Sequence, residues 1–390
     1  MSDRIAITGL GAVSAAGCGV AASLRTLRSG ARPPCVPCAV AELPVALPMF
    51  AAAGDFPKID RTFHLALAAI DEALADAGLS VFPPGFRLGV CLGTTVACQL
   101  NDIGFYREYR ATGNPALEPV ERFAAGSLAE RVARRLGTDG PALTVVNACS
   151  SGTDAMGVAM TWLKAGLCDA VLAGGADELS AIPASGFFAL GLCSPEPCKP
   201  FDRARQGLNL GEGAGVAVLE RASAAEARGR KVALLAAGFG AAADGHHLTA
   251  PHPDGLGLEA AVRAALKEAE IAPADIDFVN AHGTSTVEND RIEGHALARI
   301  FGSAVRVVST KGVTGHTLGA AGGLEAVFAA LALREGWISP SVGFETRDES
   351  IPFAPLTEVV PVVRRHALST SLAFGGNNAA FVLARAGGTP

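Results

Sequence analysis

One cysteine in this sequence stands where a nucleophile could be activated. Cys149 follows a short β-rich run, residues 142–146, and precedes a helical pattern over residues 151–165, with the small-residue turn Ser150-Ser151-Gly152 after it. A thiol at such a junction lies near the positive end of the helix dipole, which lowers its pKa. A buried structural thiol is the ordinary role for any one of the nine cysteines. The position predicts a nucleophile activated by the helix end and by a histidine elsewhere.

Two of the eight histidines, His282 and His316, stand beside a glycine in a turn of small residues. A lone histidine is more often a hydrogen-bonded core residue than a catalyst, but two in matching turns favour a functional role. Lys311 shortly precedes His316, and Glu325 follows it. These residue types together could donate hydrogen bonds and move protons.

The sequences around Cys149 and His282 match over a short stretch. Each follows Val-Asn-Ala, and in both places an apolar strand leads through a turn into a helix. A chance match is the plain explanation. The sharper one is that two homologous halves place Cys149 and His282 at equivalent strand ends, where open α/β sheets bind ligands. Beyond His282, Asp290 and Glu293 are spaced to share one helix face, for which an exposed charged face is the alternative.

Short apolar strands alternate with helical patterns along the chain, which indicates an α/β fold. The run 170–174 contains only apolar residues and glycine, as in a sheet buried on both faces. A Pro- and Cys-rich stretch, residues 32–48, is predicted to be a loop. We place a boundary near residue 230, so that domain 1–230 carries the cysteine and domain 231–390 carries both histidines. The predicted strands are 5–8, 88–93, 142–146 and 170–174, and the predicted helices are 63–77, 122–136 and 151–165.

The composition excludes several classes of protein. With 49% hydrophobic and 18% charged residues among 390, the chain can bury a large core and is not disordered. The net charge of −6 argues against nucleic acid as the main partner. No apolar run reaches the roughly eighteen residues of a membrane span. The N-terminal residues do not resemble a signal peptide, so we expect reduced thiols and a cytoplasmic location.

Three further patterns do not predict a site. Gly-Leu-Gly at residues 9–11 begins like a dinucleotide-binding loop, but residue 14 is serine and no acidic residue follows about twenty residues later, so we reject it. Cys35 and Cys38 form a C-x-x-C pair without the second pair that a zinc site needs. A histidine cluster without a recognisable metal-ligand spacing comprises His246, His247 and His252.

Several motifs occur together and in order along the chain. They are Asn147-Ala-Cys-Ser-Ser-Gly152, Lys199-Pro-Phe-Asp-Arg203, Gly211-Glu-Gly-Ala-Gly215, Asn280-Ala-His-Gly-Thr284, Lys311-Gly-Val-Thr-Gly-His316 and Phe374-Gly-Gly-Asn377. The combination resembles the elongating β-ketoacyl-(acyl carrier protein) synthases of the thiolase superfamily, over almost the whole chain. The resemblance implies an α/β, thiolase-like fold of two duplicated halves, each with a five-stranded mixed sheet, layered α-β-α-β-α.

The resemblance also implies catalytic roles. Cys149 corresponds to the nucleophile that accepts the acyl chain. His282 and His316 correspond to the pair that binds the malonyl thioester and promotes its decarboxylation, and two imidazole N–H donors suit the enolate that forms. Lys311 corresponds to the lysine that orders this site, and Glu325 to its acidic partner.

Further residues would support the site. Asp290 and Glu293 correspond to the acidic pair behind the first histidine. Thr284 and Thr286 correspond to the residues that hydrogen-bond the phosphopantetheine arm. Phe374 corresponds to the gate beside the nucleophile, where its backbone N–H and that of the nucleophile would form the oxyanion hole.

The implied reaction is a decarboxylative Claisen condensation between an acyl chain on Cys149 and malonyl-(acyl carrier protein). It needs no metal and no cofactor beyond the phosphopantetheine that the carrier supplies. The implied partners are an acyl carrier protein and a second subunit, identical or paralogous, because the family's acyl pocket abuts the partner. Carrier proteins are acidic, so a basic patch should flank the tunnel mouth, and the candidates are Lys58, Arg61 and Arg122.

The chain departs from the family in three places. Leu372 and Ala373 replace a phenylalanine and a glycine of the gate, and alanine tolerates positive φ less well than glycine, so we expect a less mobile gate. Val287 stands where many members have proline. Residues 94–102, near the expected acyl pocket and dimer seam, are more polar and less rich in glycine than in fatty-acid enzymes. These changes favour a secondary pathway such as polyketide or polyene assembly.

Other functions compete with this one. A thiolase acting on coenzyme A would need a second cysteine near the C-terminus, and none follows Cys198. A non-catalytic partner subunit, like the chain-length factors of some polyketide synthases, would lack the nucleophile. A binding module would not explain why a cysteine, two histidines and a lysine all stand in motif context.

Overall fold

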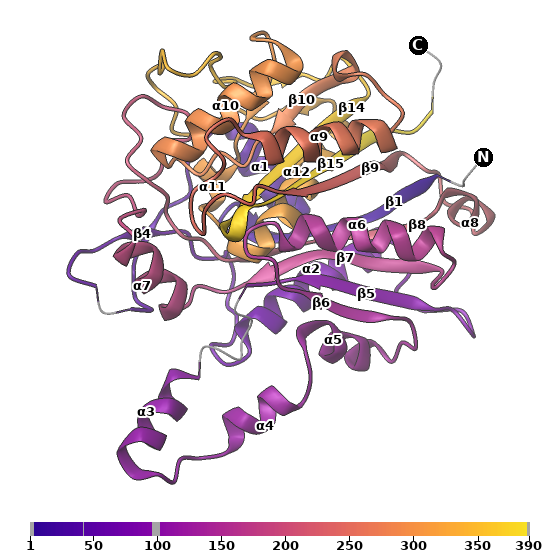
Figure 1. Ribbon diagram of the computed structural model, residues 1–390. Coiled ribbons are helices and arrows are strands. Elements are labelled where there is room, and N and C mark those ends of the chain that lie inside the picture. Colours follow the sequence, from indigo (N-terminus) through magenta and orange to yellow (C-terminus); the bar gives the residue numbers. More distant parts are fainter. Residues whose placement is uncertain (1–3, 42, 96–101, 388–390) are drawn as a thin grey trace.

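The first half of the chain builds one sheet. The computed structural model describes residues 4–41, 43–95 and 102–387 (Figure 1). The strands of this sheet are β1 (Ile5–Ser14), β5 (Leu88–Gly93), β6 (Ala142–Val145), β7 (Ala170–Asp177) and β8 (Gly213–Arg221). They lie in the order β6-β5-β7-β8-β1. β5 is parallel to both neighbours, whereas β8 is antiparallel to both of its own.

The second half repeats this arrangement. Its strands are β9 (Leu234–Ala243), β10 (Ile276–Asn280), β11 (Val307–Val308), β14 (His366–Ala373) and β15 (Asn377–Arg385). Their order, β11-β10-β14-β15-β9, and their parallel and antiparallel pairs match those of the first half position by position. The predicted duplication, with a five-stranded mixed sheet in each half, is confirmed. Short antiparallel pairing of β1 with β9 joins the two sheets, which with β2 (Gly17–Cys18) form one eleven-stranded sheet.

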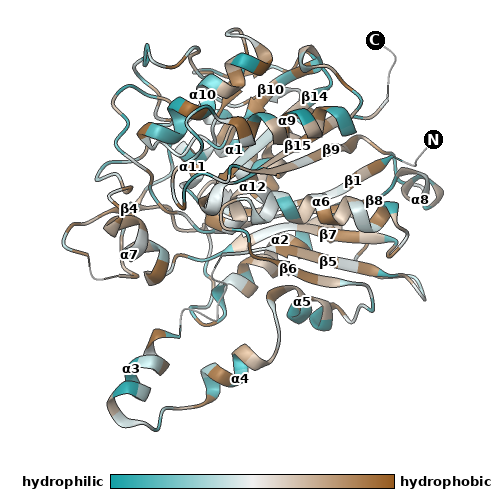
Figure 2. Cartoon of the chain, viewed as in Figure 1, coloured by the Kyte–Doolittle hydropathy of each residue, from teal (hydrophilic) through white to brown (hydrophobic). Residues whose placement is uncertain are grey.

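Helices form three layers around the two sheets, as predicted (Figure 1). α6 (Ser151–Lys164) and α12 (Ala321–Glu335) lie between the sheets and contact both. α2 (Arg61–Ala77) and α5 (Leu128–Leu136) cover the outer face of the first sheet. α9 (Leu256–Glu268) and α10 (Val287–Phe301) cover that of the second. Figure 2 shows hydrophilic turns on α5, α9 and α10, whose outer sides meet solvent.

α12 is apolar on nearly every side because both sheets and α6 surround it. Every residue from Ala321 to Leu333 is buried. Its first turn packs on the first turn of α6 through glycines, since a Cβ on Gly152 would lie 2.7 Å from the backbone nitrogen of Gly323. No larger residue fits there, so these glycines let the first turns of the two central helices come into contact.

The remaining elements are short. The helices are α1 (Val20–Ser29), α3 (Ile103–Thr112), α4 (Glu118–Ala124), α7 (Ala181–Ala189), α8 (Ala222–Ala227) and α11 (Lys311–Thr314), with 3-10 turns η2 (Pro273–Asp275), η3 (Leu318–Ala320) and η4 (Phe374–Gly376). The strands are β3 (Val36–Pro37), β4 (Pro48–Met49), β12 (Trp337–Ile338) and β13 (Val360–Pro361). α3 and α4 project from the body and bury none of their residues (Figure 1). Among the helices that the structure describes, none combines the length and the apolar character needed to cross a membrane.

Several predicted boundaries differ from those observed. The predicted helix 122–136 is two helices, because Gly126 has φ +110° and Ser127 then caps α5, with its N–H on the Glu130 carboxylate. The strand predicted at 5–8 continues to Ser14, so residues 9–11 lie in the sheet. The predicted loop 32–48 contains the small pair β3 and β4. The boundary proposed near residue 230 falls between α8 and β9 and stays a prediction.

The predicted equivalence of Cys149 and His282 is wrong. Cys149 follows β6, the third strand of its half, whereas His282 follows β10, the second strand of the other half. The third strand of the second half is β11, and the segment between it and α12 carries His316. The matching Val-Asn-Ala runs are therefore a chance match, and His316 holds the position that corresponds to Cys149.

Candidate active site

The turn that carries Cys149 is tight and strained. Ala148 has φ +47°, a left-handed conformation that costs a non-glycine residue roughly 1–2 kcal/mol. The Ser151 hydroxyl accepts a hydrogen bond from the Asn147 N–H (2.7 Å) and donates one to the Ala148 carbonyl (2.6 Å). α6 begins directly after this turn, and Cys149 is 5% exposed. The small residues after the cysteine therefore hold the turn that presents its sulfur.

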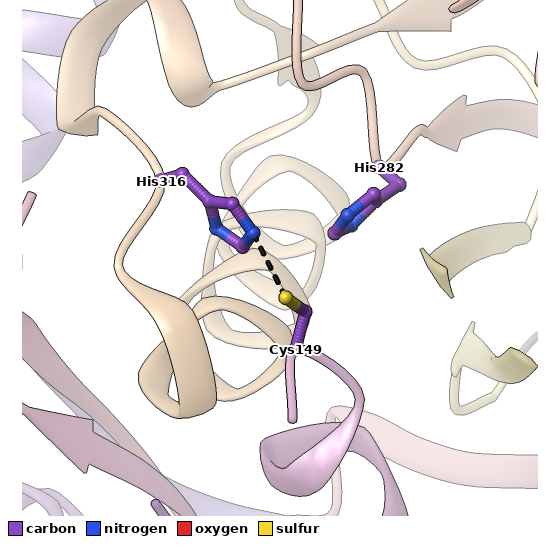
Figure 3. Close-up of side chains that lie close together, drawn as sticks. All are labelled: Cys149, His282 and His316. Atoms are coloured by element: carbon purple, nitrogen blue, oxygen red, sulfur yellow. Dashed lines mark hydrogen bonds between the residues drawn. The ribbon is translucent and has the colours of Figure 1, made fainter. Parts of the chain in front are cut away.

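His282 and His316 converge on Cys149 from the second half (Figure 3). His282 follows β10, and His316 lies between α11 and η3. Nε2 of His316 is 3.1 Å from Sγ of Cys149. The two imidazole centroids are 5.2 Å apart and the rings are nearly perpendicular, at 86°. Three residues predicted from three separate motifs thus meet in one buried place.

Hydrogen bonds to Nδ1 determine how both imidazoles face the sulfur. The Leu318 N–H donates to Nδ1 of His316 (3.3 Å), and the Lys311 ammonium, which can only donate, lies 3.3 Å from Nδ1 of His282. Burial and the Lys311 charge hold the pKa of both histidines well below the ordinary value. A neutral imidazole whose Nδ1 accepts a hydrogen bond carries its proton on Nε2. Both rings therefore present an N–H donor to the space beside Cys149.

The ligand atoms of these three side chains lie within 4.8 Å of one another, which is close enough for a metal site. A protonated Nε2 has no lone pair for a metal, however, and each Nδ1 is already engaged by its donor. Within residues 4–41, 43–95 and 102–387, no other group of at least three His, Cys, Asp or Glu side chains comes as close. The histidines at 246, 247 and 252 and the C-x-x-C pair therefore form no such group.

Lys311 is a buried cation that joins the first histidine to a carboxylate. It is 1% exposed, and besides Nδ1 its Nζ bonds the His282 carbonyl oxygen and the Glu325 carboxylate. Burial raises the pKa of Glu325 to about 7, and the Lys311 charge opposes that rise. Removing either partner would leave the other charge buried and uncompensated. The pair thus fixes the ring and backbone of His282.

Asp290 and Glu293 are fully buried, so the alternative of an exposed charged face is wrong. Glu293 accepts hydrogen bonds from the N–H groups of His282 and Gly283, both at 2.8 Å. Asp290 accepts one from the Ser285 N–H at 3.1 Å and one from the Phe201 N–H at 2.7 Å. From one face of α10, the two carboxylates hold the turn that carries the first histidine.

The surroundings of Cys149 do not produce the lowered thiol pKa that the sequence predicts. Burial raises the pKa of Cys149 to about 12, and the Lys311 charge and a hydrogen bond from the Phe374 backbone N–H offset only part of that rise. The positive end of α6 acts in the same direction as those two groups. The prediction is wrong because it counted the helix end without the desolvation of a buried sulfur.

A cavity of about 350 Å³ reaches Cys149, His282 and His316. Thr284 and Thr286 line it, with their hydroxyl oxygens 2.9 Å apart, and their contact with a polar arm stays a prediction. The ring centroid of Phe374 lies 5.1 Å from that of Phe187, and the ring centroid of Phe187 lies 6.4 Å from that of His316. The apolar part of the lining includes Val287, Leu190, Leu192, Leu208, Pro251 and Leu372.

The gate segment adopts a conformation that alanine tolerates. Ala373 has φ −126° and ψ 154°, so the expected penalty for alanine at positive φ is absent here. The Gly375 N–H donates to the Leu248 carbonyl, and the Asp244 N–H donates to the Gly376 carbonyl, both at 2.7 Å. These two bonds tie the gate to the neighbouring segment 244–248.

The predicted carrier-binding residues do not line this cavity. Arg61 forms an ion pair with the buried carboxylate of Glu212 (2.6 Å), and Arg122 forms one with Asp102 (2.9 Å). Lys58 is exposed. Of the polar stretch 94–102, residues 96–101 lie outside the described residues.

Two residues near the site were not predicted. Phe187, on α7, packs beside Phe374, and no signal in the sequence distinguishes it from the other phenylalanines. Asp177 is the last residue of β7 and is fully buried. An acid at the end of an apolar run could have revealed it, but the predicted strand stopped at residue 174.

Comparisons with known proteins agree with this geometry. Two family models match the chain: β-ketoacyl synthase, N-terminal domain, over residues 50–225, and β-ketoacyl synthase, C-terminal domain, over residues 234–345. The 3-oxoacyl-[acyl-carrier-protein] synthase 2 of Rhizobium meliloti is 35% identical over 422 residues, covering 98% of this chain and 99% of that protein. A solved structure described as the ishigamide ketosynthase/chain length factor has a TM-score of 0.92 and 32% identity, covering 99% of this chain and 100% of its own. Another, a type II PKS acyl-carrier protein in complex with its ketosynthase, has a TM-score of 0.90 and 25% identity, with coverage of 99% and 100%.

Proposed function

The chain belongs to the β-ketoacyl synthase family, and we propose on that basis that it joins an acyl chain held on Cys149 to a malonyl unit carried by an acyl carrier protein. The reaction is a decarboxylative Claisen condensation that yields a β-ketoacyl-(acyl carrier protein). The observation that carries the proposal is a buried thiol beside two neutral imidazoles: Nε2 of His316 lies 3.1 Å from its sulfur, and a ring nitrogen of His282 lies within 4.8 Å. This set suits a step that forms a thioester and a step that forms an enolate.

In the first half-reaction, the acyl group moves from the carrier thiol to Cys149. The Cys149 sulfur attacks the thioester carbonyl and loses its proton, and the carrier thiol leaves with a proton. The His316 Nε2–H at 3.1 Å and the Phe374 N–H stabilise the thiolate as it forms. The Cys149 and Phe374 backbone N–H groups are the proposed oxyanion donors.

In the second half-reaction, malonyl-(acyl carrier protein) enters the cavity and loses carbon dioxide. The bond to the carboxylate breaks, and its electron pair forms an enolate whose oxygen accepts the Nε2–H bonds of His282 and His316. The enolate carbon attacks the acyl thioester, and the Cys149 thiolate leaves and takes up a proton. Donors that are already neutral and fixed need no rearrangement as this charge develops.

The remaining residues hold this arrangement. Lys311 with Glu325 keeps Nδ1 of His282 engaged, and the acidic pair on α10 fixes the turn that carries it. Thr284 and Thr286 are proposed to bond the phosphopantetheine arm. The proposed chemistry needs no metal and no resident cofactor, because the arm belongs to the carrier.

We propose that the chain works with an acyl carrier protein and with a second subunit, identical or paralogous. The two solved relatives named above pair a ketosynthase with a chain length factor and with a carrier protein. The projecting helices α3 and α4 expose Tyr106, Tyr109 and Phe123 by 56%, 56% and 63%, as suits a surface that a partner covers. A non-catalytic role as a chain-length factor is disfavoured because Cys149 and both histidines are in place.

Further features of the chain bear on the proposed pathway and location. The altered gate residues Leu372 and Ala373, and the threonines at 94 and 95, favour polyketide or polyene assembly over housekeeping fatty-acid synthesis. All eight cysteines in the described part of the chain are free, as suits the reducing cytoplasm that we propose as its location.

Mass spectrometry tests the proposed function directly. The purified chain, with its partner subunit if one is needed, is incubated with acyl-loaded carrier protein, and peptides are searched for the acyl mass on each cysteine. We expect acylation of Cys149, and release of carbon dioxide when malonyl-loaded carrier is added. The Cys193→Ala variant should behave like the wild type, since Cys193 lies outside the catalytic group. A wild-type protein that neither acylates at Cys149 nor releases carbon dioxide would instead support the partner-subunit role.

A further inference from the structure

A fourth buried acid adjoins the catalytic group and has no part in the mechanism above. Asp177 ends β7, is fully buried, and accepts four hydrogen bonds. The Thr94 hydroxyl donates to Oδ1 (2.7 Å), and the Thr95 N–H and hydroxyl donate to Oδ2 (both 2.9 Å). The fourth donor is the Gly319 N–H, 2.7 Å from Oδ2. One carboxylate thus joins the end of β5 to a turn of the second half.

The turn held by Asp177 is the turn that orients His316. Gly319 lies in η3, directly after the Leu318 N–H that bonds Nδ1 of His316 at 3.3 Å. Leu318 has φ +54°, a conformation that a non-glycine residue keeps only when its surroundings impose it. Close packing also restricts movement of this turn, since a Cβ on Gly319 would lie 2.5 Å from the Thr94 carbonyl carbon. The Asp177 carboxylate is therefore one of the groups that impose this turn.

Asp177 also acts on the sulfur through its charge. Its carboxylate raises the pKa of the Cys149 thiol, after the larger effect of burial, in the same direction as Glu325 and against Lys311. Burial raises the pKa of Asp177 itself to about 6 against its four hydrogen bonds. The adjacent acid, Glu178, instead binds the Thr62 N–H and hydroxyl on α2, at 2.7 and 3.0 Å.

We propose that Asp177 is a positioning residue of this synthase: it holds the turn after His316 so that Nε2–H points at the reacting atoms. This role rests on the proposed function, because the turn matters through the enolate. A wild-type protein that releases no carbon dioxide contradicts the proposed function, whereas equal release by wild type and Asp177→Asn contradicts the positioning role alone.

A double-mutant cycle tests the positioning role. Carbon dioxide release from malonyl carrier protein is measured for wild type, Asp177→Asn, His316→Ala and the double variant. Asparagine keeps the size of the side chain but has one neutral acceptor oxygen in place of two that share a negative charge, so the bond from the Gly319 N–H is lost or becomes a weaker bond to an amide oxygen. We expect kcat to fall about tenfold to a hundredfold in Asp177→Asn with KM unchanged. No further loss should occur in the His316→Ala background, because the effect passes through that ring.

The matched control is Glu178→Gln, which alters the neighbouring buried acid on the side away from the site. It should leave carbon dioxide release at the wild-type rate. Full additivity in the double variant, or equal losses in Asp177→Asn and Glu178→Gln, would show a general packing effect and overturn the positioning role. Circular dichroism of each variant confirms that it is folded.

Discussion

Replacing His316 with alanine separates the two half-reactions that we propose. The imidazole supplies one of two N–H donors in the cavity, and its Nε2 lies 3.1 Å from the sulfur. The thiol, the Cys149 and Phe374 backbone N–H groups and the start of α6 all remain in the variant. Acylation of Cys149 should therefore survive, while the enolate loses a donor and decarboxylation falls.

The expected size of this loss is that of one lost hydrogen-bond donor. Removing one fixed donor from an oxyanion site costs about 100-fold to 1000-fold in rate, or about 2.7–4 kcal/mol. His282 keeps its own donor because Lys311 still engages its Nδ1, so the loss should not exceed this range. A water molecule in the space left by the ring would place the loss at the lower end. His316→Gln, which restores an N–H near the position of Nε2, should recover part of the rate.

Two measurements on the same samples test whether His316 acts in decarboxylation or in acylation. Carbon dioxide release from malonyl carrier protein reports the enolate, and mass spectrometry of the Cys149 peptide reports the acyl-enzyme. Cys149→Ala should give the reverse pattern to His316→Ala: no acyl-enzyme and no condensation, with carbon dioxide release retained. If His316→Ala abolishes acylation and leaves carbon dioxide release within about threefold of wild type, the imidazole acts as the base for the thiol and our assignment of its role is wrong.

Three further predictions follow from the gate, the surface and the buried acids. Ala373→Gly should make the gate more mobile, because glycine adds backbone freedom at an extended position, and should change which acyl chains are loaded. Unchanged hydrogen exchange in the gate together with an unchanged acyl preference would contradict this. Lys58→Glu should raise the KM for acyl carrier protein and leave the KM for small thioesters unchanged. Lys58 is chosen because reversing the charge of Arg61 would also break its ion pair with Glu212. Equal effects on both substrates would exclude a carrier contact. Burial raises the pKa of Glu178 from 4.5 to about 7, so the folded protein loses stability as pH rises through that range and the carboxyl ionises. Glu178→Gln should therefore raise the free energy of unfolding at pH 8 by up to about 3 kcal/mol and change it little at pH 4, as measured by urea unfolding.

The candidate catalytic residues could be identified as a group because their signals are local. Cys149, His282 and His316 each stand at the end of an apolar strand or beside a glycine turn, and the strand-to-helix geometry at Cys149 follows from nearby residues alone. The one-sided patterns of α2 and α6 likewise predicted those helices almost to their ends. Helix 122–136 failed because one glycine with positive φ outweighed an unbroken apolar periodicity.

Electrostatics could not be predicted, because they depend on burial and not on spacing. Asp290 and Glu293 have the spacing of an exposed charged face, yet both are buried against backbone N–H groups that lie outside their own helix. The pKa of Cys149 depends on desolvation, which the sequence does not report and which outweighs the helix end. Ala373 shows the same limit for the backbone: the residue type suggested strain, but the extended conformation at that position removes it.

The repeated topology explains why residues 167 apart in the chain can meet at 3.1 Å. In each half, the segment after the third strand leads into the central helix, so Cys149 precedes α6 and His316 precedes α12. These two helices form one layer and contact each other at their first turns, where glycines without a Cβ allow the two backbones to come close. Cys149 and His316 are therefore corresponding positions of a duplicated unit, brought together by the contact between its two copies. His282, which follows a second strand, joins them from a non-equivalent position, so the symmetry of the fold accounts for one histidine and the Lys311–Glu325 pair must hold the other.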